Sequence, residues 1–278
     1  MKNEGALMGK LMQSTETNDI IRDENDELEL VIYSVLGDRP DQQDCFGYKL
    51  DKGKCLCIVS DGMGGLNNGR DASDLCVAEF LRAFRPAEGF SVEEELLEPI
   101  RSADEKIAAL VDEKGKPLNA GCTAVSTMIC KRQLNWASVG DSRAYLFRDR
   151  QYVRLTKDQN YGTYLDESLR AGMISKTVYA DQSRFSEALI NYVGMGMVRK
   201  SGFIDFNLES LPLCSGDVLM IMSDGVYRLL DDDEINQYVI NVPDIVNMAE
   251  TLEMKMVSVS RDRNIRRDNT SLAVIRIK

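Results

Sequence analysis

Residues 46–65 read FGYKLDKGKCLCIVSDGMGG, and this stretch decides the architecture. Two apolar runs flank a turn at Asp51–Gly53, which is the pattern of a β-hairpin. The second run ends abruptly at Asp61, which glycine-rich sequence follows. An apolar strand that delivers a carboxylate to a glycine turn holds that carboxylate rigidly at the rim of a sheet. The stretch therefore predicts a paired strand with an acidic group at its end.

The same design recurs along the chain, where further aspartates stand beside turn residues at the ends of apolar runs. They are Asp44 in RPDQQD, Asp141 in SVGDSRAY, Asp224 in IMSDGV and Asp268 in RRDNTSLAV. Taken singly, each is typical of an ordinary turn. Carboxylates gathered at one rim repel one another unless cations neutralise them. The joint pattern therefore predicts a site for two divalent cations that share a bridging carboxylate.

The chain contains no histidine. This absence excludes histidine-based catalytic triads and histidine–zinc sites. A zinc site made of cysteines alone is not expected either, because no C-x-x-C pair occurs and Cys55-x-Cys57 fits the alternation of a strand. Any metal must be held by oxygen ligands, which favours Mg²⁺ or Mn²⁺ and leaves the choice between them open.

The composition limits the kinds of binding partner and the cellular compartment that we expect for this protein. The 278 residues are 44% hydrophobic, enough to bury a sizeable core, and the net charge is −11. Such a charge repels nucleic acid and anionic membranes, so neither partner is expected. No apolar run is long enough to span a bilayer, and the N-terminal sequence lacks the apolar region of a signal peptide. Seven cysteines, an odd number, indicate reduced thiols in a cytoplasmic protein, which we expect to be monomeric.

The order of the predicted elements places the chain in the α+β class. Residues 1–27 are expected to form a polar tail and residues 28–278 a single domain. Apolar periodicity predicts strands and helices in separate blocks, rather than alternating βαβ units. The expected strands cover 28–36, 46–50, 54–61, much of 121–156, 217–224 and 270–278, and the expected helices cover 71–84, a stretch from Ser91 onward, 231–240 and 243–260. Hairpin turns are expected at Lys131–Arg132 and at Asp149–Arg150.

Residues 161–201 show no clean periodicity, and we interpret them as a flap inserted near the predicted site. Segments at the rim of an active site often select the substrate and move. A passive surface insertion is the alternative, and the sequence leaves both open.

Seven segments, taken in order, resemble the metal-dependent protein phosphatases, also called PPM or type 2C serine/threonine phosphatases, and in particular their bacterial branch. The segments are GDRPDQQD, VSDGMGGLNNGRDAS, GCTAVSTMI, ASVGDSRAYLFRD, LTKDQN, MIMSDGVYRLLDDDEI and RDNTSLAVIRI, spread over about residues 30–278. The resemblance implies a four-layer α-β-β-α sandwich with two central antiparallel sheets, a flap insertion and metals at one end between the sheets. Residues 28–278 would then form one phosphatase catalytic domain.

The resemblance also implies a role for each aspartate. Asp61 would bridge both cations, and the Gly62 carbonyl would add to the second cation. Asp224 and Asp268 would complete the first, and Asp44 would act through metal-bound water. The ions would be two Mn²⁺ or Mg²⁺.

Three more residues take roles from the same resemblance. Asp141 matches the position for a third, weaker ion. Arg39 matches the arginine that grips the substrate phosphate, and its spacing to Asp44 suits a bidentate clamp. Asn269 would orient Asp268.

The implied activity is hydrolysis of phosphoserine and phosphothreonine in proteins, the products of a serine/threonine kinase. A hydroxide that bridges the two ions would attack phosphorus directly, without a covalent phosphoenzyme. The alternative is a pseudophosphatase, a phosphoprotein-binding regulator on the same fold. Retention of the four principal aspartates favours the enzyme, because binding alone does not require that set.

Some positions depart from the family pattern. Gln42 replaces the usual asparagine and is expected to loosen the turn behind the ions. Gln159 stands where histidine is frequent, and Leu66 and Arg70 replace common polar and acidic residues. Met63 stands where some members carry histidine, which leaves open the proton source for the leaving group.

Two other classes of phosphate enzyme are excluded. Cys76 and Arg82 have the C-x5-R spacing of cysteine phosphatases, but they lie in an amphipathic helix without a glycine-rich phosphate nest. Cys76 is therefore interpreted as a packing residue. A P-loop nucleotide enzyme is excluded because no G-x-x-x-x-G-K occurs.

Overall fold

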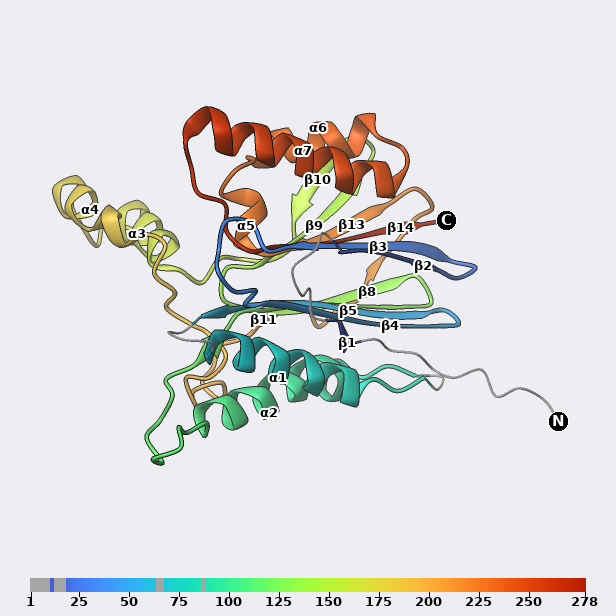
Figure 1. Ribbon diagram of the computed structural model, residues 1–278. Helices are drawn as coiled ribbons and strands as arrows, with labels where there is room; N and C mark the ends of the chain where they lie inside the picture. Colours follow the sequence, from blue (N-terminus) through green and yellow to red (C-terminus); the bar gives the residue numbers. More distant parts are fainter. Residues whose placement is uncertain (1–10, 13–18, 64–67, 87–88) are drawn as a thin grey trace.

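Two antiparallel β-sheets lie face to face, and helices cover the outer face of each (Figure 1). The computed structural model describes residues 11–12, 19–63, 68–86 and 89–278. The layers follow the order α-β-β-α, so the predicted α+β sandwich is confirmed. All strand pairs are antiparallel, as expected for elements that come in blocks.

The first sheet has the strand order β1-β4-β5-β7-β8-β11, with β6 attached to β5 and β12 attached to β8. Its strands are β1 (Leu11–Met12), β4 (Asp44–Asp51), β5 (Lys54–Met63), β6 (Gly121–Cys122), β7 (Ala124–Cys130), β8 (Gln133–Val139), β11 (Asp205–Phe206) and β12 (Leu211–Pro212). The hairpin predicted at Asp51–Gly53 joins β4 to β5.

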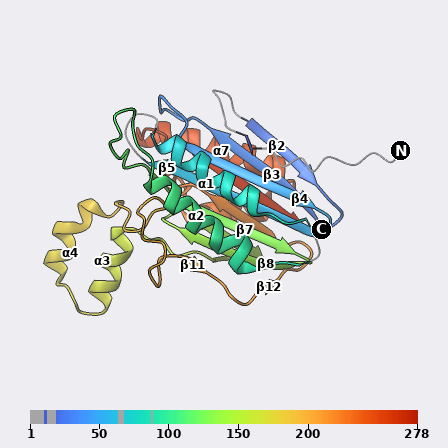
Figure 2. The same cartoon turned by 90° about the horizontal axis from the view of Figure 1, so that it is seen from below.

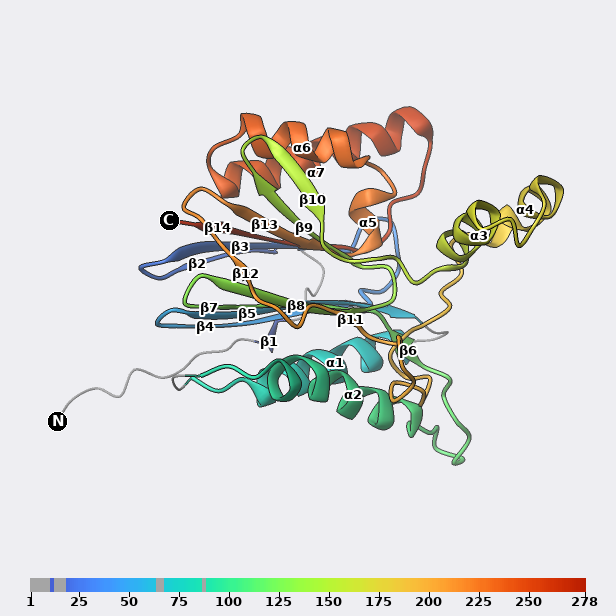
Figure 3. The same ribbon diagram turned by 180° about the vertical axis from the view of Figure 1, so that it is seen from behind.

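The second sheet has the order β10-β9-β13-β14-β3-β2. Its strands are β2 (Asp19–Glu24), β3 (Leu28–Val35), β9 (Arg143–Arg148), β10 (Gln151–Arg154), β13 (Val218–Met222) and β14 (Thr270–Ile277). The last strand of the chain, β14, therefore lies in the interior of the sheet beside β3, and Figure 3 shows this pairing from behind. In this pairing Thr270, where β14 begins, lies opposite Val35, where β3 ends. The segments before β14 and after β3 therefore lie at the same end of the sheet.

Helices pack on both outer faces. Beneath the first sheet lie α1 (Asn68–Ala83), a short π-helical turn η1 (Glu93–Leu97) and α2 (Glu98–Ala108), as seen from below in Figure 2. Over the second sheet lie α5 (Asp224–Tyr227), α6 (Asp232–Asn241) and α7 (Ile245–Arg263). In the described segments, no helix combines the length and the apolarity needed to cross a bilayer.

The buried apolar side chains form three layers, one for each interface of the sandwich. Cys76, Val77 and Phe80 of α1 pack against the first sheet. A middle layer between the sheets includes Ile32 and Val59, and the third layer packs α6 and α7 onto the second sheet. Cys76 is fully buried, which confirms its interpretation as a packing residue.

Two of the tight turns expected from the sequence take the form that twisted hairpins prefer. Lys131 and Arg132 connect β7 to β8 with positive φ at both positions, and Asp149 and Arg150 do the same between β9 and β10. Positive φ at both central residues is the mark of a type I′ turn, whose twist matches that of the flanking strands.

Part of the expected N-terminal tail is a strand. Residues 19–24 form β2 and pair with β3 along its full length. The segment is polar because it lies at the edge of the sheet, where one side remains solvated. Its assignment to a tail followed from that polarity alone. Leu66, singled out in the sequence, lies outside the described residues.

The flap consists of α3 (Tyr161–Arg170), α4 (Lys176–Gln182), a 3₁₀ turn (Ser183–Phe185) and a returning loop. Figures 1 and 2 show both helices projecting away from the sandwich. Asn160 and Ser175 cap the two helices through their side chains. The returning loop is fixed to α2, where the buried Asp104 carboxylate accepts three backbone N–H bonds, from residues 194, 196 and 198.

Candidate metal site

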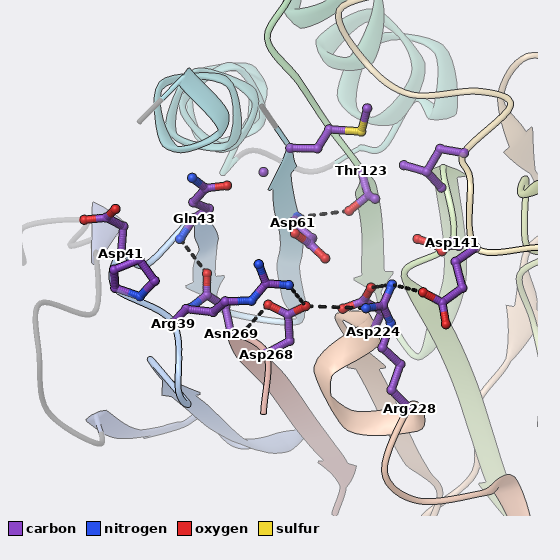
Figure 4. A pocket seen from close by; sticks show the side chains of 15 residues that line it. Arg39, Asp41, Gln43, Asp61, Thr123, Asp141, Asp224, Arg228, Asp268 and Asn269 are labelled. Carbon is purple, nitrogen blue, oxygen red and sulfur yellow. Dashed lines mark hydrogen bonds and ion pairs between the residues drawn. The ribbon is translucent and has the colours of Figure 1, made fainter. Parts of the chain in front are cut away.

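A hollow of about 500 Å³ opens at one end of the sandwich, where both sheets end together. The side chains of Asp61, Asp224 and Asp268 face into it (Figure 4). Its lining also includes Arg39, Pro40, Asp41, Gln43, Gly62, Met63, Thr123, Asp141, Glu187, Leu189, Arg228 and Asn269. Residues from seven separate stretches of the chain therefore meet at one rim.

The first sheet supplies two of the aspartates through strand pairing. Asp44 at the start of β4 lies directly opposite Asp61 near the end of β5. The backbone of Asp61 is fixed on its other side by Thr123, whose hydroxyl accepts from the Asp61 N–H at 2.9 Å and whose N–H donates to the Asp61 carbonyl at 2.8 Å. The register of the sheet thus sets the spacing of these two carboxylates.

The second sheet supplies Asp224 and Asp268 at the matching ends of two neighbouring strands. Asp224 follows β13 and Asp268 precedes β14, and these strands are paired antiparallel. Asn269 links the two sheets, since its side-chain oxygen accepts from the Gln43 N–H at 2.9 Å. Its amide nitrogen donates to the carbonyl of Leu36 at 2.8 Å. Asn269 therefore holds the loop that carries Arg39 and Asp44 against the base of β14.

Gly225 allows the closest backbone approach in this part of the site. A Cβ atom at this position would lie 2.1 Å from the carbonyl oxygen of Asn269 and 2.5 Å from the hydroxyl of Thr270. Any larger residue would push α5 away from β14. The glycine after Asp224 thus lets Asp224 and Asp268 stand side by side.

The carboxylates raise one another's pKa. Burial raises the pKa of Asp44 to about 6, with a further contribution from Asp268. Burial also raises the pKa of Asp224 to about 7, and the neighbouring Asp141 and Asp268 add to the shift, whereas Arg228 opposes it. The pKa of Asp61 lies well above its usual range because of burial and of the charge on Asp44. A site that disfavours several negative charges at once favours a compensating cation.

The donor set fits hard divalent cations. Oδ1 of Asp44 and Oδ1 of Asp224 are buried and have no hydrogen-bond partner among the residues that the structure describes. The second oxygen of Asp44 accepts from Ser223 at 2.7 Å, and that of Asp224 pairs with Arg228 at 2.8 Å. Unpartnered buried carboxylate oxygens are costly unless an ion contacts them. The donors are oxygen atoms only, which suits Mg²⁺ or Mn²⁺.

Arginine side chains already contact some of the oxygens that a cation would use. Arg39 donates to Asp268 at 2.6 Å, and Arg228 pairs with Asp224. Among the described residues, no three acidic side chains are gathered as a ready-made metal cluster. A divalent cation would therefore compete with Arg39 and Arg228 for carboxylate oxygens.

The raised pKa values predict an unusual pH dependence for the protein in EDTA. Between about pH 4 and pH 7 the folded state holds protons on Asp44 and Asp224 that the unfolded state has released, so stability falls as the pH rises through this window. We expect the melting temperature in EDTA to be about 5 °C or more higher at pH 5.5 than at pH 7.5. Thermal melts that followed the opposite trend would contradict this electrostatic account. Addition of Mn²⁺ should remove most of the difference.

The structure brings together all of the candidate residues named from the sequence. Asp141 lies in the turn between β8 and β9 and lines the same hollow as Asp61. The expectation that Gln42 loosens its turn is wrong, because Gln42 is buried and its side-chain oxygen accepts from the Asp44 N–H at 3.1 Å. Gln159 accepts from the Gly140 N–H at 3.0 Å and so fixes the turn that carries Asp141.

Two residues that form ion pairs in the site were not anticipated from the sequence. Arg228 lies one helical turn after Asp224 and also approaches Asp268 at 3.5 Å. Glu187, from the flap, pairs with Arg228 at 3.4 Å. The Asp-x-x-x-Arg spacing in SDGVYR is a signal that identifies Arg228 once α5 is recognised as helical, whereas no local pattern marks Glu187.

Comparison with known proteins gives one consistent result. Residues 37–258 match the family described as Protein phosphatase 2C. The serine/threonine phosphatase stp of Listeria welshimeri is 26% identical over 214 residues, which cover 76% of this chain and 81% of the relative. Serine/threonine phosphatase Stp1 from Staphylococcus aureus has a similar structure, with a TM-score of 0.74 and 21% identity, covering 96% of this chain and 99% of that one. The catalytic domain of PstP in complex with two manganese ions superimposes with a TM-score of 0.70 at 20% identity, covering 90% and 98% of the two chains.

Proposed function

The chain belongs to the protein phosphatase 2C family, and we propose that it removes phosphate from phosphoserine and phosphothreonine in proteins with the help of two divalent cations. The observation that carries this proposal is the meeting of Asp44, Asp61, Asp224 and Asp268 at one rim beside Arg39. Relatives named as serine/threonine phosphatases support the choice of substrate.

The aspartates are the proposed holders of the cations. We assign Asp61 to both ions, the Gly62 carbonyl to the second, and Asp224 and Asp268 to the first, with Asp44 acting through a bound water. Asp141 is assigned to a third, weaker ion. The manganese complex of PstP supports a pair of Mn²⁺ ions, and Mg²⁺ meets the same donor requirements. When bound, the cations supply acidification of water and neutralisation of phosphate charge.

The chain's own residues position these groups and the substrate. Thr123 and Ser223 fix the backbone of Asp61 and the carboxylate of Asp44 through direct hydrogen bonds. Arg39 is half exposed at the mouth of the hollow, where its guanidinium can move from Asp268 to a phosphoryl group. The planar guanidinium can donate two parallel hydrogen bonds to phosphate oxygens and offset charge that develops on them. In the proposed hydrolysis, oxygen from water attacks phosphorus directly, so no covalent phosphoenzyme forms.

Replacement of Arg39 tests this assignment. We expect Arg39→Ala to lower kcat/KM for a phosphothreonine peptide about a hundredfold at saturating Mn²⁺, because the phosphate loses its bidentate partner. Arg39→Lys keeps the charge but not the fork and should lose about tenfold. Steady-state kinetics with exposed Arg85→Ala as the matched control would measure both. A kcat/KM for Arg39→Ala within about twofold of wild type would remove Arg39 from the proposal.

The decisive experiment on the function is hydrolysis with added metal. Purified protein is expected to hydrolyse p-nitrophenyl phosphate and a phosphothreonine peptide with Mn²⁺, and to stop in EDTA. If it binds the phosphopeptide but hydrolyses neither substrate, the pseudophosphatase alternative replaces the enzyme. The proposal further includes a monomeric, cytoplasmic protein that opposes a serine/threonine kinase, and the seven free cysteines support a reducing compartment.

A further inference from the structure

Three hollows adjoin one another from the aspartates to the loop before β14. The site hollow shares Arg39, Glu187, Arg228 and Asp268 with a second hollow of about 540 Å³. The second hollow shares residues 265 and 266 with a third, of about 440 Å³. A continuous depression therefore leads from the proposed reaction centre across residues 264–267.

Arginines from separate elements line this depression, although the chain as a whole is strongly acidic. We define the arginine groove as the second hollow, which is lined by Arg39, Glu187, Gly225, Arg228, Leu229, Ile265, Arg266 and Asp268. Two of its arginines, Arg39 and Arg228, are paired with the carboxylates of the site. Arg266 forms no ion pair with an acidic side chain in the described part of the chain, so it is a cation that a further ligand can use.

The guanidinium of Arg266 is held in place by a neutral group. Its Nε and one Nη donate to the backbone carbonyl of Asp38 at 2.9 and 2.5 Å. The Asp38 carboxylate faces Arg267, accepting its backbone N–H at 2.8 Å. These contacts fix the Arg266 side chain without cancelling its charge. A fixed and uncompensated guanidinium at a groove is suited to an anion.

The groove also offers an apolar wall. Ile265 is 40% exposed, and the buried Leu229 lies beside it in the lining. Such a wall accommodates the aliphatic part of a side chain or the backbone of an extended peptide, while Arg266 meets its charged end. The combination suits a peptide that carries a negative group, rather than a free small anion.

We propose that the arginine groove binds a second anionic group of the phosphoprotein substrate, close in sequence to the phosphorylated residue. This inference rests on the proposed phosphatase function and names a substrate preference of the same site. The anionic group is a carboxylate or a second phosphate. Because the net charge of −11 repels acidic substrates at a distance, a local cation is needed to favour them at this rim.

The test uses the Mn²⁺-loaded protein and three phosphothreonine peptides that differ only within about three residues of the phosphothreonine. One has alanine at the flanking positions, one has glutamate and one has phosphoserine. We expect kcat/KM about fivefold higher for the glutamate or phosphoserine peptide than for the alanine peptide. Preference for both anionic peptides identifies any anion as the ligand, and preference for phosphoserine alone identifies phosphate.

Three variants separate the effect of the groove from general effects of charge. Arg266→Gln should remove the preference and leave kcat/KM unchanged for the alanine peptide and for p-nitrophenyl phosphate, and Arg266→Lys should keep part of it. Arg263→Gln is the matched control, because it makes the same charge change at the end of α7, three residues before Arg266, and Arg263 lines neither of the two outer hollows. Arg263→Gln should retain the preference.

Equal kcat/KM for all three peptides with wild type, or a preference that survives Arg266→Gln, would overturn the inference and leave the phosphatase function intact. Failure to hydrolyse any peptide or p-nitrophenyl phosphate would instead overturn the function itself. A preference that disappears when NaCl is raised from about 0.05 M to about 0.5 M would support an exposed ion pair as its origin.

Discussion

Asp224→Asn is expected to lower Mn²⁺-dependent kcat/KM by about a thousandfold or more and, at the same time, to raise the melting temperature of the protein in EDTA. The loss of activity follows from removal of a carboxylate assigned to the first cation. The gain in stability follows from the raised pKa of Asp224, which means that its folded environment disfavours the charged form above pH 7. A neutral side chain of the same shape avoids that cost.

The expected fall in activity and the expected rise in melting temperature together distinguish loss of a cation ligand from unfolding. A variant that failed only because it unfolded would lose activity and melting temperature together. Asp262→Asn is a suitable control, since Asp262 is exposed at the end of α7 and should change neither quantity. Activity of Asp224→Asn within about tenfold of wild type would mean that Asp224 is not a cation ligand. Thermal melts in EDTA at pH 8 and steady-state rates in Mn²⁺ provide the two measurements.

Gly225→Ala is expected to damage both stability and activity, although it adds only one methyl group next to the site. The added Cβ would lie 2.1 Å from the Asn269 carbonyl oxygen, so α5 and the base of β14 must separate. Overpacking of this kind costs about 3 kcal/mol, and the separation also moves Asp224 away from Asp268. We therefore expect activity to fall at least a hundredfold, since misplacement by about 1 Å has effects of this size.

A second glycine distinguishes the close approach from a general effect of losing glycine. Gly115 has a positive φ but no atom within 4 Å of an added Cβ. Gly115→Ala should cost about 1 kcal/mol through backbone strain and leave activity unchanged. Chemical denaturation and Mn²⁺-dependent rates on both variants would separate strain from steric displacement. Equal destabilisation of the two variants would contradict the argument for Gly225.

The α+β class was predictable because the central strands are apolar and the turns carry strong local signals, whereas the four-layer arrangement was implied only by the resemblance to the phosphatase family. The hairpin that ends at Asp61 and the paired turn residues at 131–132 and 149–150 needed no knowledge of distant contacts. β2 was missed because an edge strand can be polar, and only its partner β3 identifies it. The π-helical turn at Glu93–Leu97 was also missed, and its buried ion pair between Glu95 and Lys54 joins residues that are far apart in the sequence.

The carboxylates of the site were predictable for a different reason. Each one lies at or beside the end of a strand, and one rim of the sandwich gathers these strand ends, so a common position could be expected from the sequence. The contacts of Arg228 and Glu187 depend on how α5 and the flap are placed relative to the rim. Gln42 was misread because an isolated departure from a family pattern says nothing about the hydrogen bonds that replace the usual ones.

The attachment of the flap has a consequence for how proteins of this kind diversify. Its two ends lie close together, since Asn160 pairs with Leu189, and the returning loop is then fixed to Asp104 of α2. A segment held at its base in this way can exchange its sequence, or its length, without altering the register of either sheet. Flaps grafted between relatives at residues 160 and 189 should therefore give chimaeras that fold, which would let new specificities arise by recombination on an unchanged catalytic frame.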